Sequence, residues 1–142
     1  MAATDFYTAN IDLSFPKFPV KNTGGTAITV GQLVKLDTAN PLGATQGSVG
    51  VIPTVLVADV PFGFAAENIP AGQYGGVYGV DGQAIWGIAL GAIAIGAKVG
   101  PSTTAGQVTT YTAANPSIGQ ALTAAVNAAD PILVYIAKSL NA

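Results

Sequence analysis

The stretch AIWGIALGAIAIGAKVG, residues 84–100, decides how the chain is interpreted. It contains no charge before Lys98, and Gly87 and Gly91 have the G-x-x-x-G spacing that pairs helices in membranes. A spanning helix needs about 20 apolar residues, however, and this run is shorter and weakened as a helix by its glycines. We therefore expect the stretch to be buried in a folded core and at a subunit contact, not in lipid.

Low charge extends over the whole chain. Only 8% of its 142 residues are charged, against about 25% in soluble domains, and its mean hydropathy is +0.50. The basic residues are scattered lysines with no arginine, which argues against a nucleic-acid partner. A chain with so few charges indicates either a membrane protein or a component whose surface is buried in an assembly, and the shortness of the apolar run favours the assembly.

The residue types exclude most catalytic chemistry. Without Cys or His there is no Ser-His-Asp or Cys-His nucleophile and no thiolate or imidazole metal site. We therefore expect no enzyme, no cofactor, no metal and no small-molecule substrate. Two carboxylates could still serve a hydrolase, and Asp59 with Glu67 could hold a cation. Most acidic residues lie beside turn-forming residues, so roles in turns or at the surface are expected for Asp5, Asp12, Asp37, Asp59, Glu67, Asp81 and Asp130.

Short runs rich in Val, Ile, Thr and Tyr, bounded by Gly or Pro, predict strands. The fold class is therefore mainly β: a small barrel or sandwich of short antiparallel strands. Asp81-Gly82 predicts a hairpin between residues 73–80 and 83–88. At most two short helices are expected, at Ile88–Ile95 and Gln120–Ala128. The predicted strands lie in residues 26–36, 50–58, 73–80, 83–90, 107–113 and 131–137.

One phrase recurs: an Ile, a Gly three residues later, then an aliphatic residue or Gly three residues further on. It predicts a tight glycine turn that leads into a strand. A degraded fourth copy has Val126 in the Ile place and Ala129-Asp130 in the turn. A longer echo relates residues 63–78 to residues 119–135 and indicates two related β units. The three clear copies are Ile28/Gly31/Val34, Ile69/Gly72/Gly75 and Ile93/Gly96/Val99.

The first 22 residues differ from the rest, so we divide the chain into an extended N-terminal arm, residues 1–22, and a single β domain, residues 23–142. The arm has no Gly, and Pro16 and Pro19 favour extended geometry. It either folds back as an edge strand or anchors on a partner. Trp86 is either hairpin core or an interface anchor. The candidate partner-binding residues are Phe6, Tyr7, Phe15, Phe18 and Trp86.

The order of these segments resembles the small capsid decoration (cement) proteins of tailed bacteriophages. The resemblance runs over residues 31–136. The segments that carry it are GFAAENIPAGQYGGVYGVDGQAIWGIALGAIAIGAKVGPSTTAGQV, then IGQALTAA, then ILVYIA.

The resemblance implies a compact β-barrel-like domain, commonly trimeric, on the outer surface of the capsid. It implies that this oligomer clamps neighbouring major capsid protein subunits, and that the arm contacts the capsid or a neighbouring copy. The N-terminus lacks the features of a secretory signal, so synthesis in the host cytoplasm is expected. The Thr-rich segment STTAGQVTTYT leaves one alternative open, a glycan-binding or adhesin-like β module of a virion or cell surface.

Overall fold

The computed structural model describes residues 16–40 and 49–138, and the predicted mainly-β class is confirmed. No helix in this part of the chain is long and apolar enough to cross a membrane. Ten strands occur in it. The first five are β1 (Phe18–Asn22), β2 (Leu33–Leu36), β3 (Val49–Pro53), β4 (Gly63–Ala65) and β5 (Tyr74–Tyr78). The second five are β6 (Ala84–Ile88), β7 (Lys98–Pro101), β8 (Val108–Thr110), β9 (Gly119–Ala121) and β10 (Pro131–Ile136).

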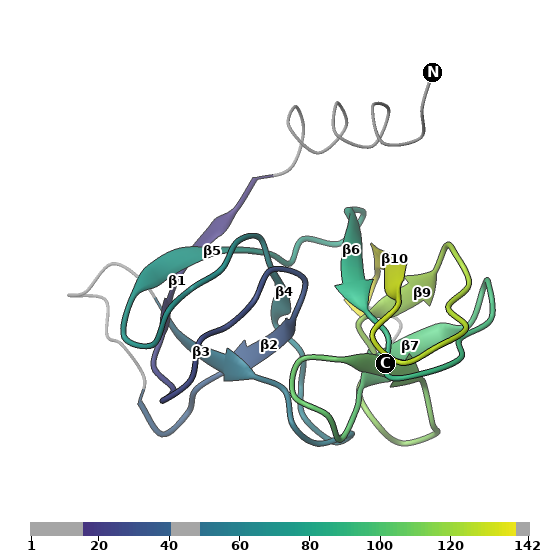
Figure 1. Cartoon of the computed structure of the whole chain (residues 1–142), viewed down its shortest axis with the longest axis horizontal. Coiled ribbons are helices and arrows are strands. Elements are labelled where there is room, and N and C mark those ends of the chain that lie inside the picture. The colour runs from purple at the N-terminus through teal and green to yellow at the C-terminus, as the bar shows by residue number, and fades with distance from the viewer. Residues whose placement is uncertain (1–15, 41–48, 139–142) are drawn as a thin grey trace.

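The two sets of five strands have the same topology. The first unit, β1–β5, is a closed barrel in the order β1-β3-β2-β4-β5, and the second unit, β6–β10, is a sheet in the order β6-β10-β9-β7-β8. When β6 is matched to β1, β7 to β2 and so on, every antiparallel pair of the first unit has its counterpart in the second. The units lie side by side in Figure 1. The echo between residues 63–78 and 119–135 thus belongs to a complete structural duplication.

The two units differ in how they close. In the first, β1 pairs with β3 in parallel over three residue pairs. In the second, the matching junction between β6 and β8 is reduced to one parallel bridge, between Ala89 and Val108. The second unit is therefore open along most of this side.

Side chains of the first unit fill the core on that open side. Leu33, Phe64 and Tyr78 belong to the same buried cluster as the core residues of β6–β10. The closest approach is at Gly87, where a Cβ atom would lie 2.7 Å from Cε1 of Phe64. The first unit keeps a separate core of its own, in which Val20 and Ile69 are fully buried. The second unit consequently depends on the first for its core.

The recurring phrase forms the turns that the sequence predicts. Gly31, Gly72 and Gly96 have φ values of +88°, +76° and +84°, and β2, β5 and β7 each begin two residues later. The copies also pair, because Ile28 bridges Ile69 with backbone hydrogen bonds of 2.9 and 2.8 Å.

The degraded copy differs in one detail. Ala125, not Val126, occupies the Ile place, since it bridges Ile93 while Val126 is 73% exposed. Its turn holds one extra residue and still reaches a positive φ, +67° at Ala129.

The predicted hairpin is wrong, although its turn is present. Gly82 has φ +95°, but β5 pairs with β1 and β4, and β6 pairs with β10. Gly82 N donates to Ile136 O and Ile136 N donates to Gln83 O, both at 2.8 Å, so the chain leaves this turn toward β10. Asp81-Gly82 therefore links the two units.

Neither predicted helix forms. Residues 88–95 and 120–128 face each other instead, joined by two backbone hydrogen bonds of 2.9 Å between Ile93 and Ala125. This tertiary pairing outweighs the helix propensity of the alanines. The six predicted strand regions each contain a strand at the expected place.

The arm is described only from Pro16 onward. Residues 18–22, which the sequence assigns to its end, form β1 and pair with both β3 and β5, so they are part of the barrel. Phe6, Tyr7 and Phe15 lie outside the described residues.

Truncation of Phe64 tests the dependence of the second unit on the first. We expect Phe64→Ala to lower the free energy of unfolding by about 3–5 kcal/mol, because it leaves a cavity over Gly87. Phe18→Ala is the matched control: Phe18 is 48% exposed, so its loss is expected to cost less than half as much. Urea unfolding measures both, and equal losses would contradict the account.

The turn copies offer a second test. Gly96 has φ +84° with open space around its Cβ position, so Gly96→Ala is expected to cost about 1 kcal/mol through backbone strain alone. Ala129 adopts φ +67° as a non-glycine residue, so Ala129→Gly is expected to stabilise by up to about 1 kcal/mol. Thermal unfolding of both variants should shift in opposite directions, and a shift in the same direction would refute the assigned turn geometry.

Candidate protein-interaction surfaces

The part of the second unit's sheet that β6 and β10 form is apolar on both faces. Along β10, Ile132, Val134 and Ile136 are fully buried, while the alternate residues point outward and are half-buried or exposed. The pairing register places Trp86 opposite Leu133 at the centre of the outward face. Its strand residues are Ala84, Trp86 and Ile88 from β6 and Pro131, Leu133 and Tyr135 from β10.

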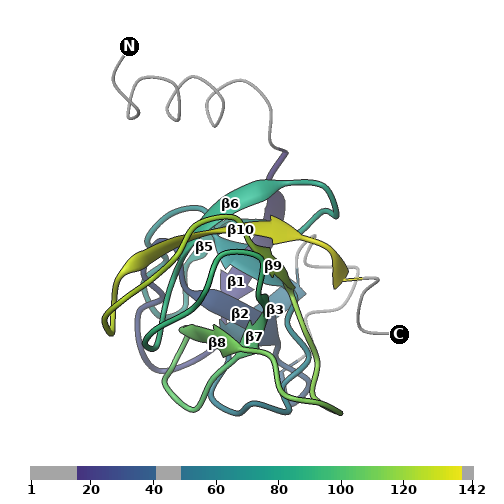
Figure 2. The same cartoon turned by 90° about the vertical axis from the view of Figure 1, so that its right-hand side faces the viewer.

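Leu122 extends this surface, since its backbone N donates to Leu133 O at 2.8 Å and its side chain is 42% exposed. We call these seven residues the Trp86 face. β6 and β10 run next to each other along one side of the second unit (Figure 2). Apolar residues on the outer face of a strand pair make this surface a candidate contact site.

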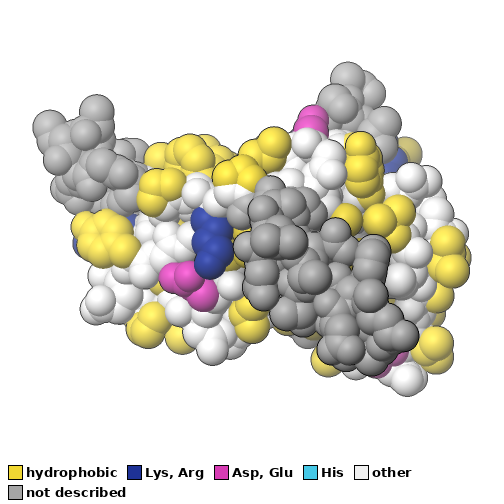
Figure 3. All heavy atoms as spheres, turned by 90° about the horizontal axis from the view of Figure 1, so that it is seen from above, with side chains coloured by type: hydrophobic (Ala, Val, Ile, Leu, Met, Phe, Trp, Pro, Cys, Tyr) yellow, Lys and Arg dark blue, Asp and Glu magenta, His cyan; other side chains and the backbone are white. Residues whose placement is uncertain are grey.

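The matching surface of the first unit has a different composition from the Trp86 face. Its matching outward positions in β1 and β5, with the adjoining residue 17, carry Lys17, Pro19 and Lys21 opposite Tyr74 and Gly76. Lys17 pairs with Glu67 at 3.8 Å, and the Lys21 ammonium lies 5.5 Å from the ring centre of Tyr74. The outward face of β1 and β5 therefore carries charged residues suited to solvent, whereas the outward face of β6 and β10 is apolar. The space-filling view shows hydrophobic side chains spread between few charged ones (Figure 3).

Of the five candidate partner-binding residues, Phe18 and Trp86 lie within the described residues, and they lie on different surfaces. The Phe18 ring meets the Phe62 ring edge-on at 5.4 Å, beside a small open pocket of about 170 Å³ that Val80 and Lys138 also line. Trp86 is half-buried at the centre of its face and is not part of the inner core. The structure does not bring these two candidates together.

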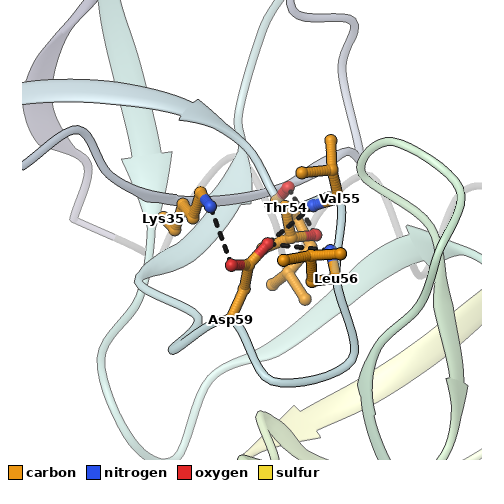
Figure 4. A network of polar contacts seen from close by, with 6 residues as sticks. Lys35, Thr54, Val55, Leu56 and Asp59 are labelled. Carbon is orange, nitrogen blue, oxygen red and sulfur yellow. Dashed lines mark hydrogen bonds and ion pairs between the residues drawn. The ribbon is translucent and has the colours of Figure 1, made fainter. Parts of the chain in front are cut away.

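A third apolar surface is the loop between β3 and β4. Val55, Leu56 and Val60 are 44%, 56% and 71% exposed. Asp59 fixes this loop: its carboxylate accepts from the Lys35 ammonium at 2.7 Å and from the backbone N–H groups of Val55 and Leu56 at 2.8 and 2.9 Å (Figure 4). The loop thus presents apolar side chains on a rigid support.

The charge of Asp59 is stabilised in place. Burial raises the pKa of its carboxyl, but the hydrogen bonds from Lys35 and the two backbone N–H groups, together with the lysine charge, outweigh burial and hold the pKa below 3.8. The Thr23 hydroxyl similarly lowers the pKa of Asp37 through a short hydrogen bond.

The described acidic residues fill the expected structural roles. Asp130 accepts from the backbone N–H groups of Val126 and Asn127, which repeats the Asp59 arrangement in the second unit. Asp81 accepts from Lys138 N, and Asp37 accepts from Ala39 N within its own turn. In residues 16–40 and 49–138 no three metal-ligating side chains gather at one place.

Sequence reasoning identified Trp86 but missed the face around it. The signal was present: in PILVYI and AIWGI, residues of both parities are apolar, whereas a half-exposed strand should alternate. The register that brings Trp86, Leu133 and Leu122 into one row depends on long-range pairing, which no local pattern specifies.

Three comparisons with known proteins bear on this chain. The family model described as "Phage cement protein" matches residues 19–136. Among solved structures, the N base of the head fiber gp8.5 of bacteriophage phi29 is 12% identical with a TM-score of 0.65, and the match covers 88% of this chain and 96% of that one. At this identity the likeness supports the fold alone. No curated protein matches the sequence.

Neutralising Asp59 tests the support of the apolar loop. We expect Asp59→Asn to lower the free energy of unfolding at pH 7 by roughly 1.5–3 kcal/mol, because charged hydrogen bonds are lost. A depressed native pKa stabilises above the unfolded value and loses that contribution as the pH falls through the native value. The difference between wild type and variant should therefore shrink below about pH 3.8. A pH-independent difference in urea unfolding would show that the carboxylate charge is not responsible.

Proposed function

The chain belongs to the phage cement protein family, a family of structural phage proteins, and from this premise we propose that it decorates the outer surface of a phage head as an oligomer. There it stabilises the lattice of the major capsid protein. The observation that carries the proposal is the Trp86 face: an apolar outer sheet surface whose counterpart in the first unit is lined with lysines. Duplicated strands with opposite surfaces point to one unit that is buried in an assembly.

The oligomer is proposed to be a homotrimer. Only 8% of the residues are charged and 50% are hydrophobic, as expected for a component that is permanently associated. Symmetric association of identical copies is the usual way to bury such surface. Three copies around a local symmetry axis would bridge several capsid subunits at once, which is how small proteins stabilise a lattice through many weak contacts.

Partner contact is assigned to Phe6, Tyr7, Phe15, Phe18 and Trp86. Aromatic side chains supply large contact area at low entropy cost, and Trp is enriched at the energetic centres of interfaces. We propose no catalytic activity, and no nucleic-acid, membrane or small-molecule partner. The role is structural, in the virion, after synthesis in the host cytoplasm.

Solution mass and co-sedimentation with expanded capsids test the function directly. A trimer that sediments with capsids supports the proposal, whereas a monomer without capsid affinity would overturn it. Binding to a glycan array instead would favour the alternative of an adhesin-like module.

Substitution of Trp86 tests the assigned surface. We expect Trp86→Ala to weaken capsid binding at least tenfold, because a central aromatic anchor is lost. Tyr74→Ala is the matched control, since Tyr74 is 57% exposed on the equivalent strand pair of the first unit, and it should leave binding unchanged. Equal effects of the two substitutions would remove the Trp86 face from the interface. Far-UV circular dichroism checks that both variants are folded.

A further inference from the structure

The second unit has a further exposed apolar surface, which lies outside the Trp86 face. Residues 88–95 and 120–128 lie side by side there, joined through Ile93 and Ala125 (Figure 1). Ile95 and Val126 are 69% and 73% exposed, which makes them among the most exposed large apolar residues of the described chain. We call the exposed apolar residues of these two segments the turn patch: Ala92, Ala94, Ile95, Ala124 and Val126.

We propose that copies of this chain contact each other through the turn patch, around the symmetry axis of the oligomer. The inference deepens the proposed function and rests on its statement that the copies associate. It assigns the surface that they use, and it separates this surface from the ones that contact other proteins.

The first support is the absence of charge. Residues 88–97 and 118–129 contain no charged residue. Close to a rotation axis, each residue of one copy lies near the same residue of the next copy. A charged residue in such a place meets a like charge, which opposes association. An uncharged surface is therefore what a contact between identical copies requires.

The second support is the matching turn pair of the first unit, which is polar. Asn68 stands there in the place of Ala124, and its Oδ1 accepts a hydrogen bond from the backbone N of Val30 at 2.8 Å. The adjacent Glu67 forms an ion pair with Lys17 at 3.8 Å. The same pair of turns thus forms with polar residues in one unit, so the fold does not require the apolar residues of the turn patch.

The loop between β3 and β4 shows why the occupant is a second copy and not a different protein. Its apolar residues Val55 and Leu56 are held by Asp59, whose carboxylate also accepts from Lys35 at 2.7 Å. A partner of different sequence can offer complementary groups to such charges, whereas a copy on its own axis offers the same charges again. The uncharged turn patch therefore suits a contact between copies, and the loop suits another partner.

The third support is the low cost of ordering this surface. Alanine loses no rotamer freedom on burial, and three of the five residues of the turn patch are alanines. The backbone below them is fixed by two hydrogen bonds of 2.9 Å between Ile93 and Ala125, and by one of 2.8 Å from Gly96 N to Ala121 O. A surface that is ordered before contact keeps more of its binding energy.

The solution mass of the full-length chain tests the inference. We expect Ile95→Asp with Val126→Asp to reduce the mass from that of the oligomer to that of one chain, because carboxylates of neighbouring copies are brought together. Val30→Asp with Val60→Asp is the matched control. These two residues are 56% and 71% exposed on the first unit, so the control adds the same charge at similar exposure and should keep the wild-type mass.

The outcomes distinguish this inference from the proposed function. A wild type that remains a single chain at every concentration would overturn both. An oligomeric wild type whose mass survives the substitutions at Ile95 and Val126 would overturn the inference alone. Equal loss of mass in the control would also contradict it, because added charge anywhere would then be sufficient. Far-UV circular dichroism checks that both double variants are folded.

Cross-linking tests the same contact without added charge. The chain has no cysteine, so Val126→Cys places one reactive thiol on each copy. We expect a short bismaleimide to join two copies of this variant. Val30→Cys places the thiol on the matching turn pair of the first unit and is expected to give no joined product. Equal yields from the two variants, or none from Val126→Cys in an oligomeric sample, would refute the assignment.

Discussion

The Phe64 ring lies against the backbone of Gly87, where any Cβ would be 2.7 Å from it, and the arrangement of both units depends on this contact. Leu33, Phe64 and Tyr78 complete a core that the second unit cannot close, since its β6–β8 junction has a single bridge. Two hydrogen bonds of 2.8 Å, from Leu33 N to Gly106 O and from Gly106 N to Thr54 O, fix the turn before β8 beside β2. The units therefore cannot move apart without exposing apolar core, and the surfaces they carry keep a fixed relative position.

Duplication explains how one small chain presents two kinds of surface. The inward positions of matched strands have to stay apolar because each unit needs a core, so they constrain the sequence in both copies. The outward positions carry no such demand, and they have diverged from Lys17 and Lys21 in the first unit to Ala84 and Ile88 in the second. The comparison within one molecule separates what the fold requires from what an interaction requires. The apolar residues of the Trp86 face lie outside both core clusters, and the proposed partner contact would account for them.

How much of the fold could be predicted from the sequence depends on whether the interactions involved are local or join residues far apart in the chain. The glycine turns at Gly31, Gly72 and Gly96 were predictable because a left-handed backbone is a local property of glycine. The hairpin at Asp81-Gly82 was not predictable, because the turn is a local property but the choice of partner strand is not, and β6 pairs with β10 of its own unit. The helices predicted at residues 88–95 and 120–128 do not form for the same reason: alanine favours a helix locally, but Ile93 and Ala125 pair across the two segments. The pairing of Phe18–Asn22 with β3 and β5 also could not be predicted, because composition does not specify which strands pair.

The apolar residues at exposed positions have a consequence for assembly. A rigid loop bearing Val55 and Leu56, an edge-on pair of Phe18 with Phe62, and the Trp86 face lie on different parts of one fixed body. A stable interface typically buries about 800 Å² per partner, and several separate contacts can add up to such an area. On a repeating lattice, however, a rigid body that touches several subunits binds them together, because losing one contact leaves the others to hold it in place. The proposed lattice-stabilising role would therefore require the two units to keep a fixed relative position, and the packing of Phe64 into the core of the second unit supports this.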